Sequence, residues 1–154
     1  MLRQAFTQRL REAMKARDAR TTSTVRMILA ELKERDVAAR GQGNSDGIPD
    51  DDARRMLQAM IKQRRESVVL YEKGNRADLV RQEREEIAVI ESFLPHQLDE
   101  GEIEAAAKAA IAESGAAKLN DMGKVMAALR ERHAGAIDLG RAGAIVRRLL
   151  GATA

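Results

Sequence analysis

The sequence predicts an all-α protein in two parts. Its apolar residues recur with the 3.6-residue period of amphipathic helices, and strand-like alternation is missing. Glycines and capping residues divide the chain into about seven helical segments, with no internal repeat. We expect a division near Pro95. Residues 1–95 would form an N-terminal helical part with a long-helix hairpin, and residues 96–154 a compact three-helix tail.

The N-terminal part is expected to contain four helices and one flexible loop. The helices are predicted over about residues 2–16, from about 18, from 50 to 74 and from 75 to just before Pro95. The loop (residues 41–49, GQGNSDGIP) is rich in glycine and polar residues. Gly74 is expected to end the third helix with a left-handed cap, and Asn75 to cap the fourth.

The tail carries start and stop signals for three more helices. Asp99 and Glu102 have the spacing of a capping box, so a helix should begin there and end near Gly115. The following helices are predicted over about residues 120–133 and 138–151, the second with an aspartate at its start.

Composition excludes several classes of protein. The chain of 154 residues is 33% charged and 44% hydrophobic, which is typical of a globular protein. It has no apolar run that could cross a bilayer or act as a signal peptide, so no membrane association is expected. The absence of cysteine suits a reducing cytoplasm, and two histidines alone argue against a metal site.

Charge is distributed unevenly along the chain. The formal net charge is only +3. However, residues 1–40 hold ten Lys/Arg against five Asp/Glu, and residues 122–154 hold six against two. Basic ends suit contact with a polyanion, although such asymmetry is also common among solvated helices.

Motifs for catalysis are missing, and we predict no catalytic residue and no cofactor. The run Met122-Gly123-Lys124-Val125 resembles part of a phosphate-binding loop. It lacks the glycine five residues earlier, the Ser/Thr after the lysine and a preceding strand. A helix start is the better interpretation of this segment.

Three charges fall within the apolar stripes of the predicted third and fourth helices. Arg64 lies ten residues before Gly74, and Glu83 and Glu86 lie nine and twelve after it. A short turn forces the two helices into an antiparallel hairpin, so these charges should meet. The main interpretation is a salt bridge that sets the register of the hairpin. The alternatives are a catalytic carboxylate pair tuned by Arg64 and a cluster that is simply solvated.

The basic tail is the best candidate for a binding surface. Six cations lie outside its predicted apolar stripes: Lys124, Arg130, Arg132, Arg141, Arg147 and Arg148. Such a surface could neutralise several phosphates. The chain has only two phenylalanines and one tyrosine, so a stacking platform for bases is not evident. Any RNA contact would therefore be to backbone and shape, and the alternative is a solvated polar face.

Two segments resemble a known family. The run from Asp121 to Leu150 (DMGKVMAALRERHAGAIDLGRAGAIVRRLL) is similar to the helical tail of GatB, the tRNA-binding subunit of glutamine-using amidotransferases. The run from Ile61 to Leu98 (IKQRRESVVLYEKGNRADLVRQEREEIAVIESFLPHQL) resembles the stand-alone YqeY proteins, which share that tail. Arg17-Asp18 and Val25-Arg26-Met27 extend the likeness toward the start of the chain.

The resemblance implies a function in translation. It suggests a non-catalytic accessory that binds tRNA near an aminoacyl-tRNA synthetase or an amidotransferase. The family connection carries the label of a carbon–nitrogen ligase with glutamine as amide donor. That chemistry needs an amidase partner and a large ATP-using domain, for which this chain is too short. The alternative is a helical adaptor between proteins, which an uncovered apolar patch would favour.

Overall fold

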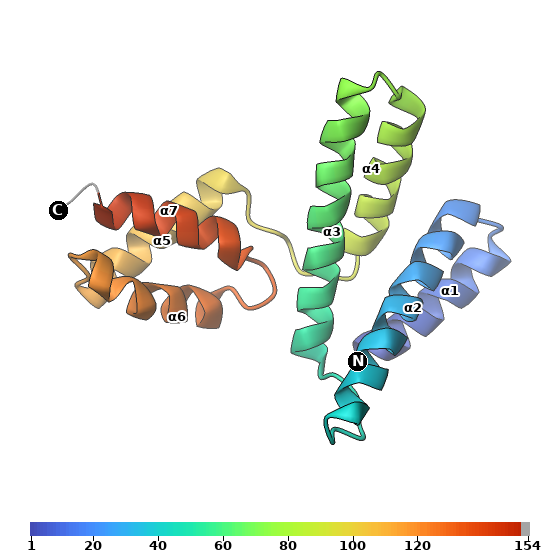
Figure 1. Ribbon diagram of the computed structural model, residues 1–154, viewed down its shortest axis with the longest axis horizontal. Helices are drawn as coiled ribbons and strands as arrows, with labels where there is room; N and C mark the ends of the chain where they lie inside the picture. Colours follow the sequence, from blue (N-terminus) through green and yellow to red (C-terminus); the bar gives the residue numbers. More distant parts are fainter. Residues whose placement is uncertain (152–154) are drawn as a thin grey trace. The chain divides into compact units, whose positions relative to one another are not determined.

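The computed structural model describes residues 1–151 and confirms the all-α prediction. Over this range the chain forms seven α-helices and one 3₁₀ turn, with no strand (Figure 1). Contacts between helices divide it into two compact units, Met1–Pro95 and the residues from His96 onward. None of the helices within residues 1–151 combines the length and the apolar character needed to cross a membrane.

Two helical hairpins make up the N-terminal unit (Figure 1). The first consists of α1 (Leu2–Lys15) and α2 (Ala19–Gly41), and the second of α3 (Asp50–Lys73) and α4 (Ala77–Glu91). α2 packs against both helices of the second hairpin, mainly against α4. The second helix begins where expected, because the Asp18 side chain accepts a hydrogen bond from the Thr21 amide at 3.0 Å.

The core of this unit lies between the hairpins. Its fully buried large side chains include Phe6, Val25, Ile28, Met56, Leu57 and Ile90. Phe6 also meets Phe93 edge-on, with the ring centroids 4.8 Å apart. Residues from the first helix and from the end of the fourth therefore share one apolar cluster.

One buried carboxylate holds the end of the loop that we expected to be flexible. Asp36 accepts hydrogen bonds from both terminal guanidinium nitrogens of Arg3 and from the Ile48 amide at 2.9 Å. Arg3 also donates to the Ile48 carbonyl at 2.8 Å. The Arg3 guanidinium is the main cause that lowers the pKa of Asp36. These bonds connect the starts of α1 and α3 with the second half of α2.

The turn between α3 and α4 differs from the prediction. Gly74 ends α3 but has φ −85°, so it does not supply the left-handed cap. Asn75 takes that conformation instead, with φ +54°. Asparagine tolerates this region better than most residues because its short polar side chain can hydrogen-bond locally. Asn75 therefore does not cap α4, whose cap is Arg76, without a side-chain hydrogen bond to the helix start.

The second unit contains α5 (Glu100–Ser114), α6 (Met122–Arg132) and α7 (Leu139–Gly151), and all three pack against one another. Its buried core includes Ile103, Val125, Leu129, Ile137, Val146 and Leu150. A 3₁₀ turn, Leu119–Asp121, precedes α6, so the α-helix itself begins two residues later than expected.

Three caps fix the ends of these helices. The capping box between Asp99 and Glu102 is present at the start of α5, and Gly115 ends that helix with φ +68°. Asp138 accepts from the amides of Gly140 and Arg141 at 2.9 and 3.2 Å, as an aspartate at the start of α7 should.

Candidate functional site

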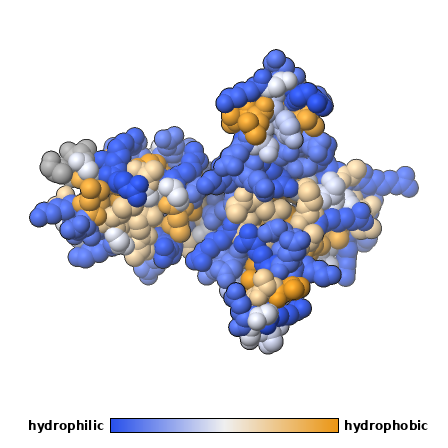
Figure 2. Space-filling model, viewed as in Figure 1, coloured by the Kyte–Doolittle hydropathy of each residue, from blue (hydrophilic) through white to orange (hydrophobic). Residues whose placement is uncertain are grey.

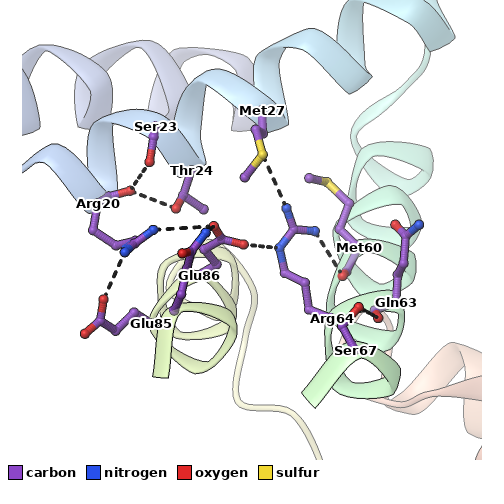
Figure 3. Close-up of polar contacts among 11 residues, drawn as sticks. Arg20, Ser23, Thr24, Met27, Met60, Gln63, Arg64, Ser67, Glu85 and Glu86 are labelled. Atoms are coloured by element: carbon purple, nitrogen blue, oxygen red, sulfur yellow. Dashed lines mark hydrogen bonds and ion pairs between the residues drawn. The ribbon is translucent and has the colours of Figure 1, made fainter. Parts of the chain in front are cut away.

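An ionic cluster joins three helices of the N-terminal unit (Figure 3). Arg64 of α3 donates from Nε to Glu86 of α4 at 3.0 Å, and its side chain is only 12% exposed. Glu86 is buried, and its second oxygen faces Arg20 of α2 at 3.7 Å. Arg64 also donates to the Met60 carbonyl at 3.3 Å. The cluster therefore connects the two hairpins to each other and also joins the two helices of the α3–α4 hairpin.

Arg20 is the member of this cluster that the sequence did not reveal. It also pairs with Glu85 at 3.1 Å, on the outer side of α4 (Figure 3). Arg20 lies one residue before Thr21, at the margin of the buried stripe of α2. This position is the only feature of the local sequence that suggests a contact for Arg20. That signal could not identify a partner, because the packing of α2 on α4 joins residues 65 apart in the chain.

Glu83 interacts electrostatically with Glu86, Arg64 and Arg20 of the cluster. Burial is the largest cause that raises the pKa of its carboxyl, and the nearby Glu86 carboxylate raises it further. Arg64 and Arg20 act in the opposite direction and do not fully compensate. The direct partner of Arg64 is thus Glu86, while Glu83 carries a charge that its surroundings disfavour.

Glu83→Gln is expected to stabilise the protein at neutral pH. The pKa of Glu83 is raised above its ordinary value of 4.5, so folding opposes its ionisation. Ionisation of Glu83 therefore lowers the free energy of unfolding as the pH rises from 4.5 through the folded-state pKa of this carboxyl. The variant avoids this loss, so its Tm should exceed that of the parent by on the order of 1–3 °C at pH 7. Calorimetry should show the difference vanishing near pH 3, and a constant difference would contradict the assignment.

The cluster has the properties of a structural connection. One oxygen of Glu86 accepts from Arg64, and the other faces Arg20 and accepts from Gln82 at 3.4 Å. Both oxygens are occupied, so neither is available to take a proton from a substrate. Within residues 1–151, no group of three or more histidine, aspartate or glutamate side chains is arranged to hold a metal ion.

The six basic candidates of the tail are all exposed, but only two of them form ion pairs among the described residues. Arg132 forms an ion pair with Glu113 of α5, and Arg148 pairs with Glu104 of α5 at 3.4 Å. Both pairs are exposed and therefore weak, so either arginine could exchange its carboxylate for another anion. α5 thus presents acidic groups beside part of the basic surface.

The other four tail cations have a different environment: Lys124, Arg130, Arg141 and Arg147. In the part of the chain that the structure describes, no carboxylate lies within ion-pair distance of them. Arg141 shares the flank of α7 that faces α5, because it lies seven residues from Arg148. Gly143 lies against the Met122 and Met126 side chains of α6, and Arg147 follows it by one turn. The structure thus spreads the cations over both flanks of α7.

A second basic stripe escaped the sequence-based prediction. Arg26, Lys33 and Arg40 lie seven residues apart along α2, so they share one face of this helix. All three are exposed, and no carboxylate of the described residues lies within ion-pair distance of them. The excess of basic residues over positions 1–40 was the available signal, and the seven-residue spacing could have located it.

Comparisons with known proteins give the family. A family model described as YqeY-like protein matches residues 3–150. The chain is 32% identical over 85 residues to "Altered inheritance of mitochondria protein 41, mitochondrial" of Lachancea thermotolerans. The aligned segment covers 55% of this chain and 43% of that protein. The protein of the same name from Kluyveromyces lactis is 28% identical over 89 residues, 58% of this chain and 46% of its own length. The chain thus spans less than half the length of these relatives, and it belongs to the YqeY-like family.

Proposed function

We propose that this protein is a non-catalytic accessory that binds tRNA through the basic surface of α6 and α7. The observation that carries the proposal is the group of four exposed cations, Lys124, Arg130, Arg141 and Arg147, without carboxylate partners among the described residues. Such cations can neutralise phosphates at no loss of an internal ion pair. The resemblance of the tail to that of GatB supports tRNA as the polyanion.

The acidic groups of α5 limit where RNA can contact this surface. Glu104 and Glu113 face Arg148 and Arg132, so a phosphate near them meets repulsion as well as attraction. The favourable region is therefore the part of α6 and α7 that lies away from Glu104 and Glu113. With no aromatic residue in the tail, we propose that recognition uses RNA shape and backbone.

The proposed partners are an aminoacyl-tRNA synthetase or an amidotransferase that uses the bound tRNA. Carbon–nitrogen ligation with glutamine as amide donor would then be the chemistry of such a partner. We propose a reducing compartment such as the cytoplasm, because the chain contains no cysteine. The two relatives are themselves named as mitochondrial proteins.

Removing the four free tail cations should weaken tRNA binding. The variant Lys124→Ala, Arg130→Ala, Arg141→Ala and Arg147→Ala is expected to lose roughly ten- to hundredfold in affinity near 0.1 M salt. The magnitude of its salt slope should fall by about one unit for each phosphate contact that is lost. Fluorescence anisotropy with labelled tRNA over a salt series measures both quantities.

Two further variants make this experiment decisive. Arg11→Ala, Lys15→Ala, Lys62→Ala and Lys73→Ala removes the same number of exposed charges from the N-terminal unit and should leave binding close to that of the parent. Alanine at Arg26, Lys33 and Arg40 tests the stripe on α2. If only this stripe variant lost affinity, the RNA surface would be on α2 and the tail would be excluded. Equal losses in all variants would indicate nonspecific attraction by net charge.

A protein–protein adaptor is the second candidate function. Val69 and Leu70 of α3 are 49% and 66% exposed, and apolar surface is visible at the free end of the α3–α4 hairpin (Figure 2). Exposed apolar side chains at one end of a hairpin are typical of a contact with another protein.

A further inference from the structure

A cleft of about 690 Å³ lies beside the turn that joins α3 and α4. α3 contributes Tyr71 and Glu72 to its lining, and most of the other lining residues belong to α4. α4 contributes Ala77, Val80, Arg81, Arg84, Glu85 and Ala88. The volume lies in the range of ligand-binding sites. The cleft is independent of the proposed tRNA surface, because it belongs entirely to the N-terminal unit.

Apart from Glu85, which pairs with Arg20, the lining residues of α4 occupy the face of the helix opposite Glu86. They recur at intervals of three and four residues, so they form one stripe. Glu86, which points into the hairpin packing, lies about half a turn from Ala77, Arg84 and Ala88. No helix of the N-terminal unit covers this stripe, since its members on α4 are exposed or half-buried.

The dimensions of the stripe suit a helix. From Ala77 to Ala88 it extends over three turns, or about 16 Å. Both ends carry alanine, whose small side chain allows the backbone of a second helix to approach closely. Val80 and Tyr71, both half-buried, offer apolar surface between these ends. An amphipathic helix could insert side chains spaced by one turn along such a surface.

The charges around the cleft favour an acidic occupant. The two acids of the lining are already engaged, Glu72 by Arg84 at 2.8 Å and Glu85 by Arg20 at 3.1 Å. Arg81 is exposed and has no carboxylate within ion-pair distance among residues 1–151. Arg84 is 64% exposed, so its present pair is weak and can be shared with another carboxylate.

We propose that this cleft binds an acidic amphipathic helix of another protein. Apolar side chains of the partner contact Tyr71 and Val80, and its carboxylates face Arg81 and Arg84. Val69 and Leu70 are also exposed near this end of the hairpin, but they do not line the cleft.

The test uses the full chain and a library of roughly 15-residue peptides displayed on phage, a length that covers the three-turn stripe. Selection should enrich peptides that combine Glu or Asp with apolar residues one turn apart. The enriched peptide, synthesised and titrated into ¹⁵N-labelled protein, should shift the amide signals of residues 71–88. Arg81→Glu and Ala88→Glu should each weaken its binding at least tenfold. Lys62→Glu is the matched control, since it reverses a charge on exposed surface outside the cleft.

Each of the other outcomes overturns the proposal. Failure to enrich any peptide, or enrichment of basic peptides, would show that the cleft does not select an acidic helix. Amide shifts confined to other residues would place the contact elsewhere. Displacement of the peptide by tRNA, with equal loss of tRNA affinity in Arg81→Glu, would make the cleft a nucleic-acid surface. Self-association that Ala88→Glu abolishes, measured by sedimentation, would identify a second copy of the chain as the occupant.

Discussion

Glu86→Ala is expected to lower the free energy of unfolding by about 3–5 kcal/mol. The substitution removes the carboxylate that faces both Arg64 and Arg20 and leaves the largely buried Arg64 guanidinium without its counter-charge. It also removes the contact of Glu86 with Arg20 of α2, which leaves the exposed Arg20–Glu85 pair between α2 and α4. Urea denaturation monitored by circular dichroism measures the change as a shift of the midpoint.

Two companion variants separate this effect from a general loss of charge. Glu85→Ala removes a neighbouring carboxylate that is 48% exposed, and it should cost less than about 1 kcal/mol. The double variant Arg64→Met and Glu86→Leu replaces the pair by apolar groups and should recover much of the loss. If Glu86→Ala were no more destabilising than Glu85→Ala, the cluster would have no structural role.

Gly47→Ala is expected to destabilise the protein by about 2–4 kcal/mol. Gly47 has φ +81°, a conformation that alanine adopts only with strain. A Cβ atom at this position would also lie 2.4 Å from Oδ1 of Asp36, the atom that accepts from Arg3 and from the Ile48 amide. The carboxylate must move, and the bonds that hold the loop weaken together. Thermal unfolding measures the effect as a lower Tm.

Gly43→Ala is the matched control for this position. Gly43 has a similar positive φ of +94°, but a Cβ there would meet nothing within 4 Å. It should therefore cost only the backbone strain, about 1 kcal/mol. The difference between the two variants isolates the contact with Asp36. Equal destabilisation by both would show that this contact contributes little.

Sequence patterns located those features that depend on neighbouring residues. The capping box of Asp99 and Glu102 involves residues three apart, and Gly115 follows the last apolar residue of its helix, so both were predictable. The turn at Gly74 depends on more than the neighbouring residues. Glycine adopts the left-handed conformation more readily than asparagine, so Gly74 was the better candidate for it. In the structure Asn75 adopts this conformation, because the residue at which α3 ends decides which of the two must have a positive φ.

The candidate sites also contain some contacts that local spacing predicts and others that depend on tertiary packing. Helical spacing across a short turn is enough to place Arg64 opposite Glu86. It could not supply Arg20, whose contact depends on how two hairpins pack. Nor could it show that Glu104 and Glu113 neutralise part of the basic tail, because these pairs join separate helices. The apolar stripe of a helix indicates which of its charged side chains are exposed, whereas the partner of an exposed charge depends on tertiary packing.

The contact between Phe6 and Phe93 has a consequence for biosynthesis. It joins the first helix to a residue just beyond the end of α4, so the apolar core of the N-terminal unit needs both ends of that unit. On the ribosome, the α1–α2 hairpin emerges long before Phe93 does. Its apolar face therefore stays open until roughly the first hundred residues have left the exit tunnel. A nascent chain stalled before that point is expected to be digested readily by protease, whereas a longer one becomes resistant.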